Sequence, residues 1–204
     1  MHGMEPAQER LKDRIPLRRG AHPSREDGLC TMELVAWLAG EPHSDEPRCA
    51  CPVLAAFVRT VNDSVEDQDR ERLLRPLAPL LVNSRADAAV EQARGMMLLD
   101  VLVREVVPAW LRARGRRHAA AGLAALPEVG AGTSVAEAAA ALAEAAPDLR
   151  PAQWTVRSAL AGMAPARFAP GVALAARQVG RQAIWGVAQR IVLRATAGPR
   201  AVPV

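Results

Sequence analysis

The chain has 204 residues, of which half are apolar, 24% are charged and 3% are aromatic, and its formal net charge is +4. This composition is typical of one globular domain or two small ones, and with no Tyr, four Trp and two Phe it argues against an aromatic platform for single-stranded nucleic acid. No uncharged stretch reaches the roughly 18–20 residues of a membrane-spanning helix, and the first residues lack the apolar core of a signal peptide, so we expect a cytoplasmic protein with reduced thiols.

The N-terminal part of the chain is predicted to be a tail followed by short helices. Residues 1–28 mix charges of both signs with Pro and Gly, so they are expected to form a disordered tail. Apolar residues at helical spacing begin at Cys30, and a Gly-Glu-Pro sequence at 40–42 is expected to end that helix. After a polar loop, a second helix is expected to begin near Pro52, and a charged helix over about 65–74 follows it.

The longest predicted helix spans about 85–114 and is apolar around nearly its whole circumference between Met96 and Val107. A helix of this kind lies at the centre of a bundle. Pro108 is expected to kink it or to separate its last turn.

The composition changes after the basic cluster at 112–118, which is the best internal boundary in the chain. The following segment is rich in alanine, and its Ser134-x-x-Glu137 capping box predicts the start of a helix. A last long helix is expected over about 171–195, with a bend at Gly186.

No stretch alternates between apolar and polar residues with the period of a strand. We therefore predict an all-α protein, a multi-helix bundle with a more mobile Arg-rich C-terminal helix. The expected parts are a disordered tail, an N-terminal helical bundle, Ala-rich helices with the basic C-terminal helix, and a second tail. In chain order these parts are residues 1–28, 29–115, 116–196 and 197–204.

Positive charge is concentrated at the C-terminal end. Residues 1–117 carry 18 basic and 18 acidic side chains, whereas residues 151–204 carry seven Arg and no acidic side chain. These arginines could pair with acidic residues of the bundle, face solvent near helix ends, or bind an anionic partner by charge. The arginines expected at a partner or anion contact are Arg112, Arg114, Arg116, Arg117, Arg177, Arg181, Arg190 and Arg194.

A candidate metal site lies between the first two predicted helices. Thiolates and carboxylates are ligands for Zn or Fe, and Cys30, Glu33, Asp45 and Cys49 lie close together in the sequence. Their spacing matches no established ligand pattern. The structural interpretation is that Cys30 is a small buried residue and that polar side chains, among them Glu33, hold the loop by hydrogen bonds. Redox chemistry of Cys49 with Cys51 is a further alternative.

An acid–base pair lies on the apolar helix, with Asp100 four residues before Arg104. This order favours an ion pair on a helix, and a neighbouring guanidinium favours the ionised carboxylate, so we predict a structural ion pair and not a general base. The sequence contains no nucleotide-binding glycine loop, no nucleophile elbow and no zinc-protease motif. We therefore assign no catalytic residue.

Two stretches carry a specific motif: 29-LCTMELVAWLAGEPHSDEPRCACPVLAAFVRTVND-63 and 98-LLDVLVREVVPAWLRARG-115. With its C-x-M-E…L-A-G-E…S-D-x-P-x-C-x-x-P…N-D pattern, the chain resembles a group of small helical proteins of high-GC bacteria over residues 30–115. The resemblance implies a helical fold and no particular activity. In that group His often stands between the Asp and the Pro of the motif, where this chain has Glu46, which argues against an imidazole ligand there.

Three functional hypotheses follow. The first is a non-enzymatic scaffold or adaptor that needs no cofactor and contacts a protein partner through the basic C-terminal helix. The second is a metal-binding protein or metalloenzyme with Zn or Fe in the loop between Cys30 and Cys51. The third is binding of nucleic acid or an anionic membrane by the C-terminal segment.

Overall fold

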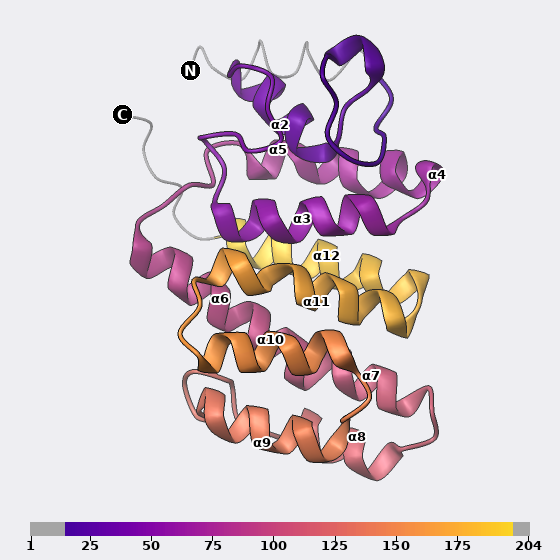
Figure 1. Ribbon diagram of the computed structural model, residues 1–204, viewed down its shortest axis with the longest axis vertical. Helices are drawn as coiled ribbons and strands as arrows, with labels where there is room; N and C mark the ends of the chain where they lie inside the picture. Colours follow the sequence, from indigo (N-terminus) through magenta and orange to yellow (C-terminus); the bar gives the residue numbers. More distant parts are fainter. Residues whose placement is uncertain (1–14, 198–204) are drawn as a thin grey trace.

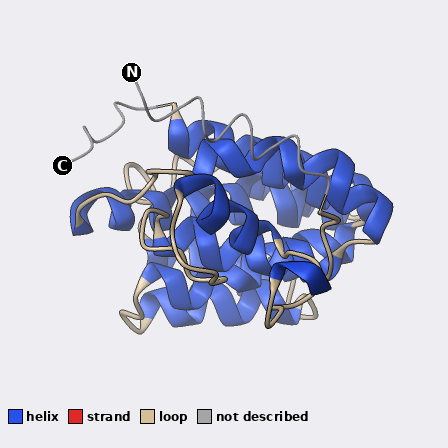
Figure 2. Ribbon diagram, turned by 90° about the horizontal axis from the view of Figure 1, so that it is seen from above, coloured by secondary structure: helices blue, strands red, loops and turns tan. Residues whose placement is uncertain are grey.

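The computed structural model describes residues 15–197, which form a stack of helices joined by loops (Figures 1 and 2). The predicted all-α multi-helix bundle is confirmed, since this part of the chain has two isolated backbone bridges and no strand. None of its helices is both long enough and apolar enough to cross a bilayer. The α-helices are α2 (Thr31–Ala39), α3 (Pro52–Ser64), α4 (Asp67–Asp69), α5 (Ala78–Leu81), α6 (Ala88–Val101), α7 (Val107–Arg112), α8 (Arg117–Ala124), α9 (Val135–Ala145), α10 (Arg150–Leu160), α11 (Pro165–Val179) and α12 (Arg181–Thr196). Two π-helical segments, η2 (Arg70–Leu74) and η4 (Leu102–Val106), and two 3₁₀ turns, η1 (Arg25–Asp27) and η3 (Arg75–Leu77), complete the list.

Local capping signals set several helix ends. Helix α2 begins after Cys30 and ends at Gly40, and α3 begins at Pro52, as the sequence predicts. Helix α9 begins at the predicted capping box, in which the backbone N–H of Glu137 donates to the Ser134 hydroxyl and the Glu137 carboxylate accepts from the Ser134 N–H. These ends depend on residues three or four positions apart, so they are readable from the sequence.

The predicted charged helix and the predicted long helix both contain π-helical turns. The charged segment 65–74 forms the single turn α4 followed by η2. The long segment forms α6, η4 and α7, with Pro108 in the first turn of α7. Proline has no N–H to donate to the carbonyl four residues earlier, and the wider turn of η4 lies directly before it. The expected interruption at Pro108 is therefore a π-helical segment.

The last predicted helix is two helices. Helix α11 ends at Val179 and α12 begins at Arg181, with Gly180 between them at φ +140°. Only glycine adopts this backbone conformation without strain. The interruption thus lies at Gly180, whereas Gly186, where the sequence predicts a bend, lies within the continuous helix α12.

One hydrophobic core runs through the described residues, from Leu17 to Val192. The most extensive helix–helix contact joins α11 to α3 (Figure 1), and α11 also packs on α6, α10 and α12. The predicted boundary at 115/116 therefore does not separate two cores, since a helix of the second part lies against helices of the first. Helix α12 is likewise packed on the bundle, against α3, α5, α6 and α11.

The predicted tail begins to pack earlier than expected. Leu17 is only 2% exposed, and its neighbours pair with Leu29 through backbone hydrogen bonds of 2.8 and 3.1 Å. The N–H of Gly20 donates to Asp63 on α3 at 2.9 Å. The disorder predicted for 1–28 is therefore wrong for residues 15–28, because polar groups of the folded helices satisfy this charged segment; residues 1–14 and 198–204 lie outside the described range.

Candidate functional site

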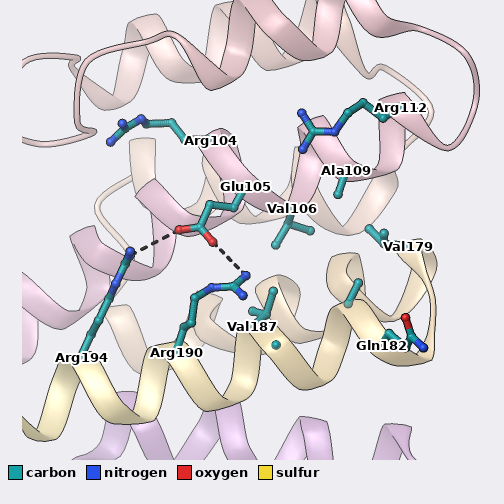
Figure 3. Close-up of a pocket in the computed structure, with 12 residues that line it drawn as sticks. Arg104, Glu105, Val106, Ala109, Arg112, Val179, Gln182, Val187, Arg190 and Arg194 are labelled. Atoms are coloured by element: carbon teal, nitrogen blue, oxygen red, sulfur yellow. Dashed lines mark hydrogen bonds and ion pairs between the residues drawn. The ribbon is translucent and has the colours of Figure 1, made fainter.

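A pocket of about 520 Å³ lies between α12 and the segment formed by η4 and α7 (Figure 3). Its polar lining comes from both sides. The η4–α7 wall contributes Arg104, Glu105 and Arg112, and α12 contributes Gln182, Arg190 and Arg194. Four arginines and one glutamate thus line the pocket.

The helix geometry explains why these side chains share one pocket. Arg190 and Arg194 are four residues apart on α12, so they lie on the same face. Arg104 and Glu105 are adjacent in sequence and would diverge on a regular α-helix, yet both line the pocket from the π-helical segment η4. Such π turns often occur at functional sites.

Glu105 bridges two of the four arginines. Its Oε2 lies 2.9 Å from Arg190 Nη2, and its Oε1 lies 3.3 Å from Arg194 Nη1, as Figure 3 shows. All three side chains are partly exposed, since 30% of Glu105 and about half of each arginine remain accessible. Exposed ion pairs of this kind are weak.

The other two arginines of the pocket differ in their partners. Arg104 Nη1 donates to Asp100 Oδ1 at 3.0 Å, which is the predicted structural ion pair. Asp100 is 9% exposed and the same oxygen accepts the backbone N–H of Val129 at 3.0 Å, so this carboxylate also holds the loop before α9. Arg112 is exposed, and its side chain has no hydrogen-bond or ion-pair partner within residues 15–197.

Apolar side chains cover the rest of the pocket wall. They include Val106 and Ala109 on one side and Val187 on α12. Gly186 also lies at the wall, and a Cβ atom there would stand 3.0 Å from Arg190 Nη1. The absence of a side chain at Gly186 therefore leaves room for the Arg190 guanidinium.

Of the eight arginines predicted at a partner or anion contact, three line the pocket: Arg112, Arg190 and Arg194. Two others are engaged inside the protein. The guanidinium carbon of Arg114 lies 3.9 Å from the ring centroid of Trp110, and Arg181 Nη2 donates to Asp69 Oδ1 at 2.6 Å. The remaining three, which do not line the pocket, are exposed: Arg116, Arg117 and Arg177.

The Arg181–Asp69 pair joins α12 to α4. Asp69 is 2% exposed, and Arg181 Nε also contacts its Oδ2. Hydrogen bonds from Arg181 hold the pKa of Asp69 below its ordinary value, although burial acts in the opposite direction. Charge of the C-terminal helix is thus neutralised in part by the N-terminal bundle, as one of the sequence alternatives expected.

The apolar face that would have served a protein partner on the C-terminal helix is covered. Ile184 and Ile191 are 2% and 0% exposed, and among the large aliphatic residues of α12 only Leu193 is exposed, at 46%. The C-terminal helix, expected from the sequence to contact a partner, thus has little apolar surface to offer one. What α12 presents outward is its arginines.

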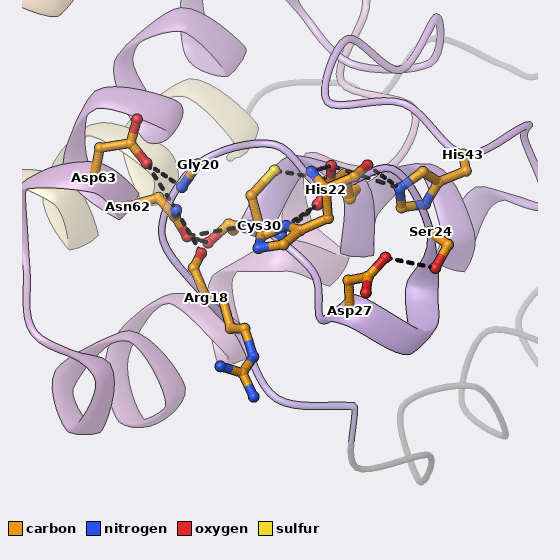
Figure 4. Close-up of polar contacts among 11 residues, drawn as sticks. Arg18, Gly20, His22, Ser24, Asp27, Cys30, His43, Asn62 and Asp63 are labelled. Carbon is orange, nitrogen blue, oxygen red and sulfur yellow. Dashed lines mark hydrogen bonds and ion pairs between the residues drawn. The ribbon is translucent and has the colours of Figure 1, made fainter.

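A second polar cluster surrounds the buried carboxylate of Glu33, and Figure 4 shows its members His22, Cys30 and His43. The backbone N–H groups of His22 and Cys30 each donate to Glu33 at 2.6 Å, and His22 Nδ1 donates at 2.9 Å. His43 Nε2 donates to the His22 carbonyl at 2.8 Å and lies 3.6 Å from Glu33 Oε1. Glu33 is 1% exposed, so this cluster fastens the segment before α2 and the loop after it to the helix start.

The pKa values in this cluster follow from burial and hydrogen bonding. Burial raises the pKa of Glu33, but the hydrogen bonds from His22 and Cys30 outweigh it, and the pKa lies below its ordinary value. Burial raises the pKa of Cys30 to about 12 and also raises that of Cys49. Neither thiol is therefore activated as a nucleophile.

The predicted metal site is not formed. Within residues 15–197 no three His, Cys, Asp or Glu side chains are arranged to hold a metal ion. Cys30 accepts the N–H of Glu33 as the cap of α2, while the backbone N–H of Cys49 donates to Glu41. Asp45 lies 3.9 Å from Arg59. Cys30 and Glu33 thus pair with each other at the start of α2, Asp45 and Cys49 have other partners, and all three cysteines are free thiols.

Three participants in these clusters were missed by sequence reasoning. His22 was assigned to the tail, and Arg104 was assigned only a structural ion pair. Glu105 was not singled out, although it is the only acidic residue between Val101 and Pro127, in a stretch that also holds the basic cluster. A single acidic residue within a basic stretch is the sequence signal that points to Glu105.

In comparisons with protein-family models, with curated proteins and with solved structures, nothing matches this chain. The function must therefore be argued from the site.

Proposed function

We propose that this protein binds a small anionic ligand, without catalysis, in the pocket between α12 and η4–α7. The observation that carries this proposal is that four arginines, from two walls, line one pocket. A volume of about 520 Å³ suits a small molecule. Guanidinium groups are the side chains best suited to bind carboxylates and phosphates.

Charge balance supports an anionic ligand. The four pocket arginines have two carboxylates as partners, Glu105 and Asp100, and two positive charges are left over. Arg112 contributes one of them without any partner in the described part of the chain. An unpaired guanidinium at a pocket wall is a ready hydrogen-bond donor for an anion.

The pocket supports binding better than catalysis. Among the described residues that line it there is no His, Cys, Ser, Thr or Lys, and Glu105 is engaged by two arginines. A positioned nucleophile or general base is therefore missing from this wall. The third sequence hypothesis, anion binding by the C-terminal segment, is thus kept in a narrower form, with a pocket in place of an extended surface.

The test is ligand-dependent thermal stability of the full chain at low salt. Inorganic phosphate, organic phosphates and dicarboxylates are added to the wild type, to Arg112→Gln and to the control Arg157→Gln, an exposed arginine on α10 away from the pocket. A ligand at about 100 times its Kd stabilises the folded state by about 2.7 kcal/mol, which raises Tm by about 5–10 °C in a chain of this size.

We expect this increase in the wild type and in R157Q, and a much smaller one in R112Q. Without ligand, R112Q should melt with the wild type, because Arg112 has no partner to lose. The proposal is wrong if no anion raises Tm, or if the increase in R112Q equals that in the wild type.

A further inference from the structure

Glu105 occupies the place of a ligand group. Among the described residues it is the only carboxylate that lines the pocket, and each of its two oxygens pairs with one guanidinium of α12. Figure 3 shows its side chain reaching from the η4 wall toward Arg190 and Arg194. A ligand that uses these two arginines must compete with Glu105.

This competition discriminates between kinds of anion. A monocarboxylate would replace Glu105 with an equivalent group, so it gains little. A phosphate monoester carries about −1.5 to −2 charges at neutral pH and offers three acceptor oxygens. It can therefore take the place of Glu105 at Arg190 and Arg194 and still has an acceptor oxygen for a third guanidinium of the pocket wall, such as that of Arg112, which has no partner among the described residues.

The walls also indicate an organic ligand. Val106, Ala109 and Val187 line the pocket beside the arginines. Apolar walls contribute nothing to a bare inorganic ion, whereas they bury part of a carbon skeleton. The same two positive charges that remain after internal pairing match one phosphate dianion.

We infer that the ligand class is an organic phosphate monoester, and that Glu105 is an internal competitor that the phosphate group displaces from Arg190 and Arg194. This inference rests on the proposed function. It adds the chemical class of the ligand and a residue that sets the affinity.

The experiment uses probes that share a phenyl ring. Phenyl phosphate, phenyl sulfate and benzoate are titrated into the full chain by calorimetry at low salt. Inorganic phosphate serves as the probe that lacks the phenyl ring. We expect phenyl phosphate to bind at least about tenfold more tightly than phenyl sulfate or benzoate, because it adds a second charge. Inorganic phosphate should bind more weakly than phenyl phosphate.

The variant Glu105→Gln tests the competitor. Removing the Glu105 charge should tighten phenyl phosphate binding about fivefold. This is the factor expected when a partly exposed carboxylate no longer competes with the phosphate for Arg190 and Arg194. The matched control is Glu144→Gln on α9, which changes the net charge equally outside the pocket and should leave the affinity unchanged. Far-UV circular dichroism verifies the fold, and Glu105→Ala provides a second variant.

The outcomes separate the two proposals. If benzoate or phenyl sulfate binds as tightly as phenyl phosphate and Arg112→Gln weakens all three, the anion pocket stands and the phosphate assignment is wrong. If Glu105→Gln and Glu105→Ala bind no more tightly than the wild type, the competitor role is wrong. If no probe binds in a way that depends on Arg112, both proposals fail.

Discussion

Replacing Glu33 by Gln should destabilise the protein strongly, because the substitution keeps the shape of the side chain and removes only its charge. Three N–H groups, two from the backbone and one from the His22 ring, donate to this carboxylate at 2.6, 2.6 and 2.9 Å. The side chain is 1% exposed, so water does not replace a lost partner. An amide has one acceptor oxygen and turns an NH₂ group toward the remaining donors.

The magnitude follows from the hydrogen bonds. A hydrogen bond to a charged group contributes about 1.5–3 kcal/mol, and a buried donor left without a partner costs about 1–3 kcal/mol. Since Gln can satisfy part of the cluster, we expect Glu33→Gln to lower the free energy of unfolding by about 3–5 kcal/mol at neutral pH. That is a large share of the roughly 5–15 kcal/mol that holds a domain together.

The assay is urea unfolding followed by circular dichroism between pH 7 and pH 3. The pKa of Glu33 is lowered in the folded protein, so its stabilising contribution is complete above the ordinary value of about 4.3 and is lost as the pH falls through the folded value. The difference between wild type and Glu33→Gln should therefore be constant near neutral pH and shrink in acid.

The matched control is Glu137→Gln, which alters the equivalent capping-box residue of α9, where the carboxylate is exposed to solvent. Its effect should be much smaller. Two results would show that a buried, ionised carboxylate does not hold this cluster. One is an equal loss of unfolding free energy in the two variants, and the other is a loss in Glu33→Gln that does not shrink in acid.

Three further predictions concern packing, backbone and thiols. Gly180→Ala should destabilise the protein by about 1–3 kcal/mol, because only glycine suits φ +140°, whereas Gly186→Ala within α12 should stay within about 1 kcal/mol of the wild type; urea unfolding measures both. Gly171→Ala should cost about 1–3 kcal/mol, since its Cβ would lie 1.9 Å from Thr155 Oγ1, and adding Thr155→Ala should recover part of the loss. Iodoacetamide at pH 8 should modify Cys49 before the other two cysteines, which are buried, and peptide mass spectrometry identifies the order.

Much of the fold is encoded in local patterns. The caps of α2 and α9 and the start of α3 depend on residues within one helical turn, and each lies where the sequence predicted it. The apolar circumference of the segment around Leu98 likewise predicted a central helix, and its residues are buried. Periodicity and capping are short-range properties, so a single sequence is enough to read them.

The rest depends on contacts that are distant in sequence. The charge of residues 15–28 predicts disorder. The partners that order them, such as Asp63 and Glu33, belong to helices further along the sequence. The sequence predicted one long helix with a bend at Gly186, whereas the structure has two helices separated at Gly180, because either glycine permits an irregular backbone and the local pattern does not distinguish them. Composition cannot supply either piece of information.

The pocket shows why arginines of the C-terminal helix were only partly interpretable. Helix α12 has two faces: Ile184 and Ile191 pack into the core, and Arg190 and Arg194 lie at the pocket wall. Burial of two large aliphatic side chains contributes about 3–6 kcal/mol, far more than the exposed ion pairs of Glu105. The core therefore sets the orientation of α12, and this orientation places the two arginines at the pocket wall. Because their backbone is fixed by packing and not by their own ion pairs, the exchange of a ligand with Glu105 that we propose would leave the helix that carries them folded.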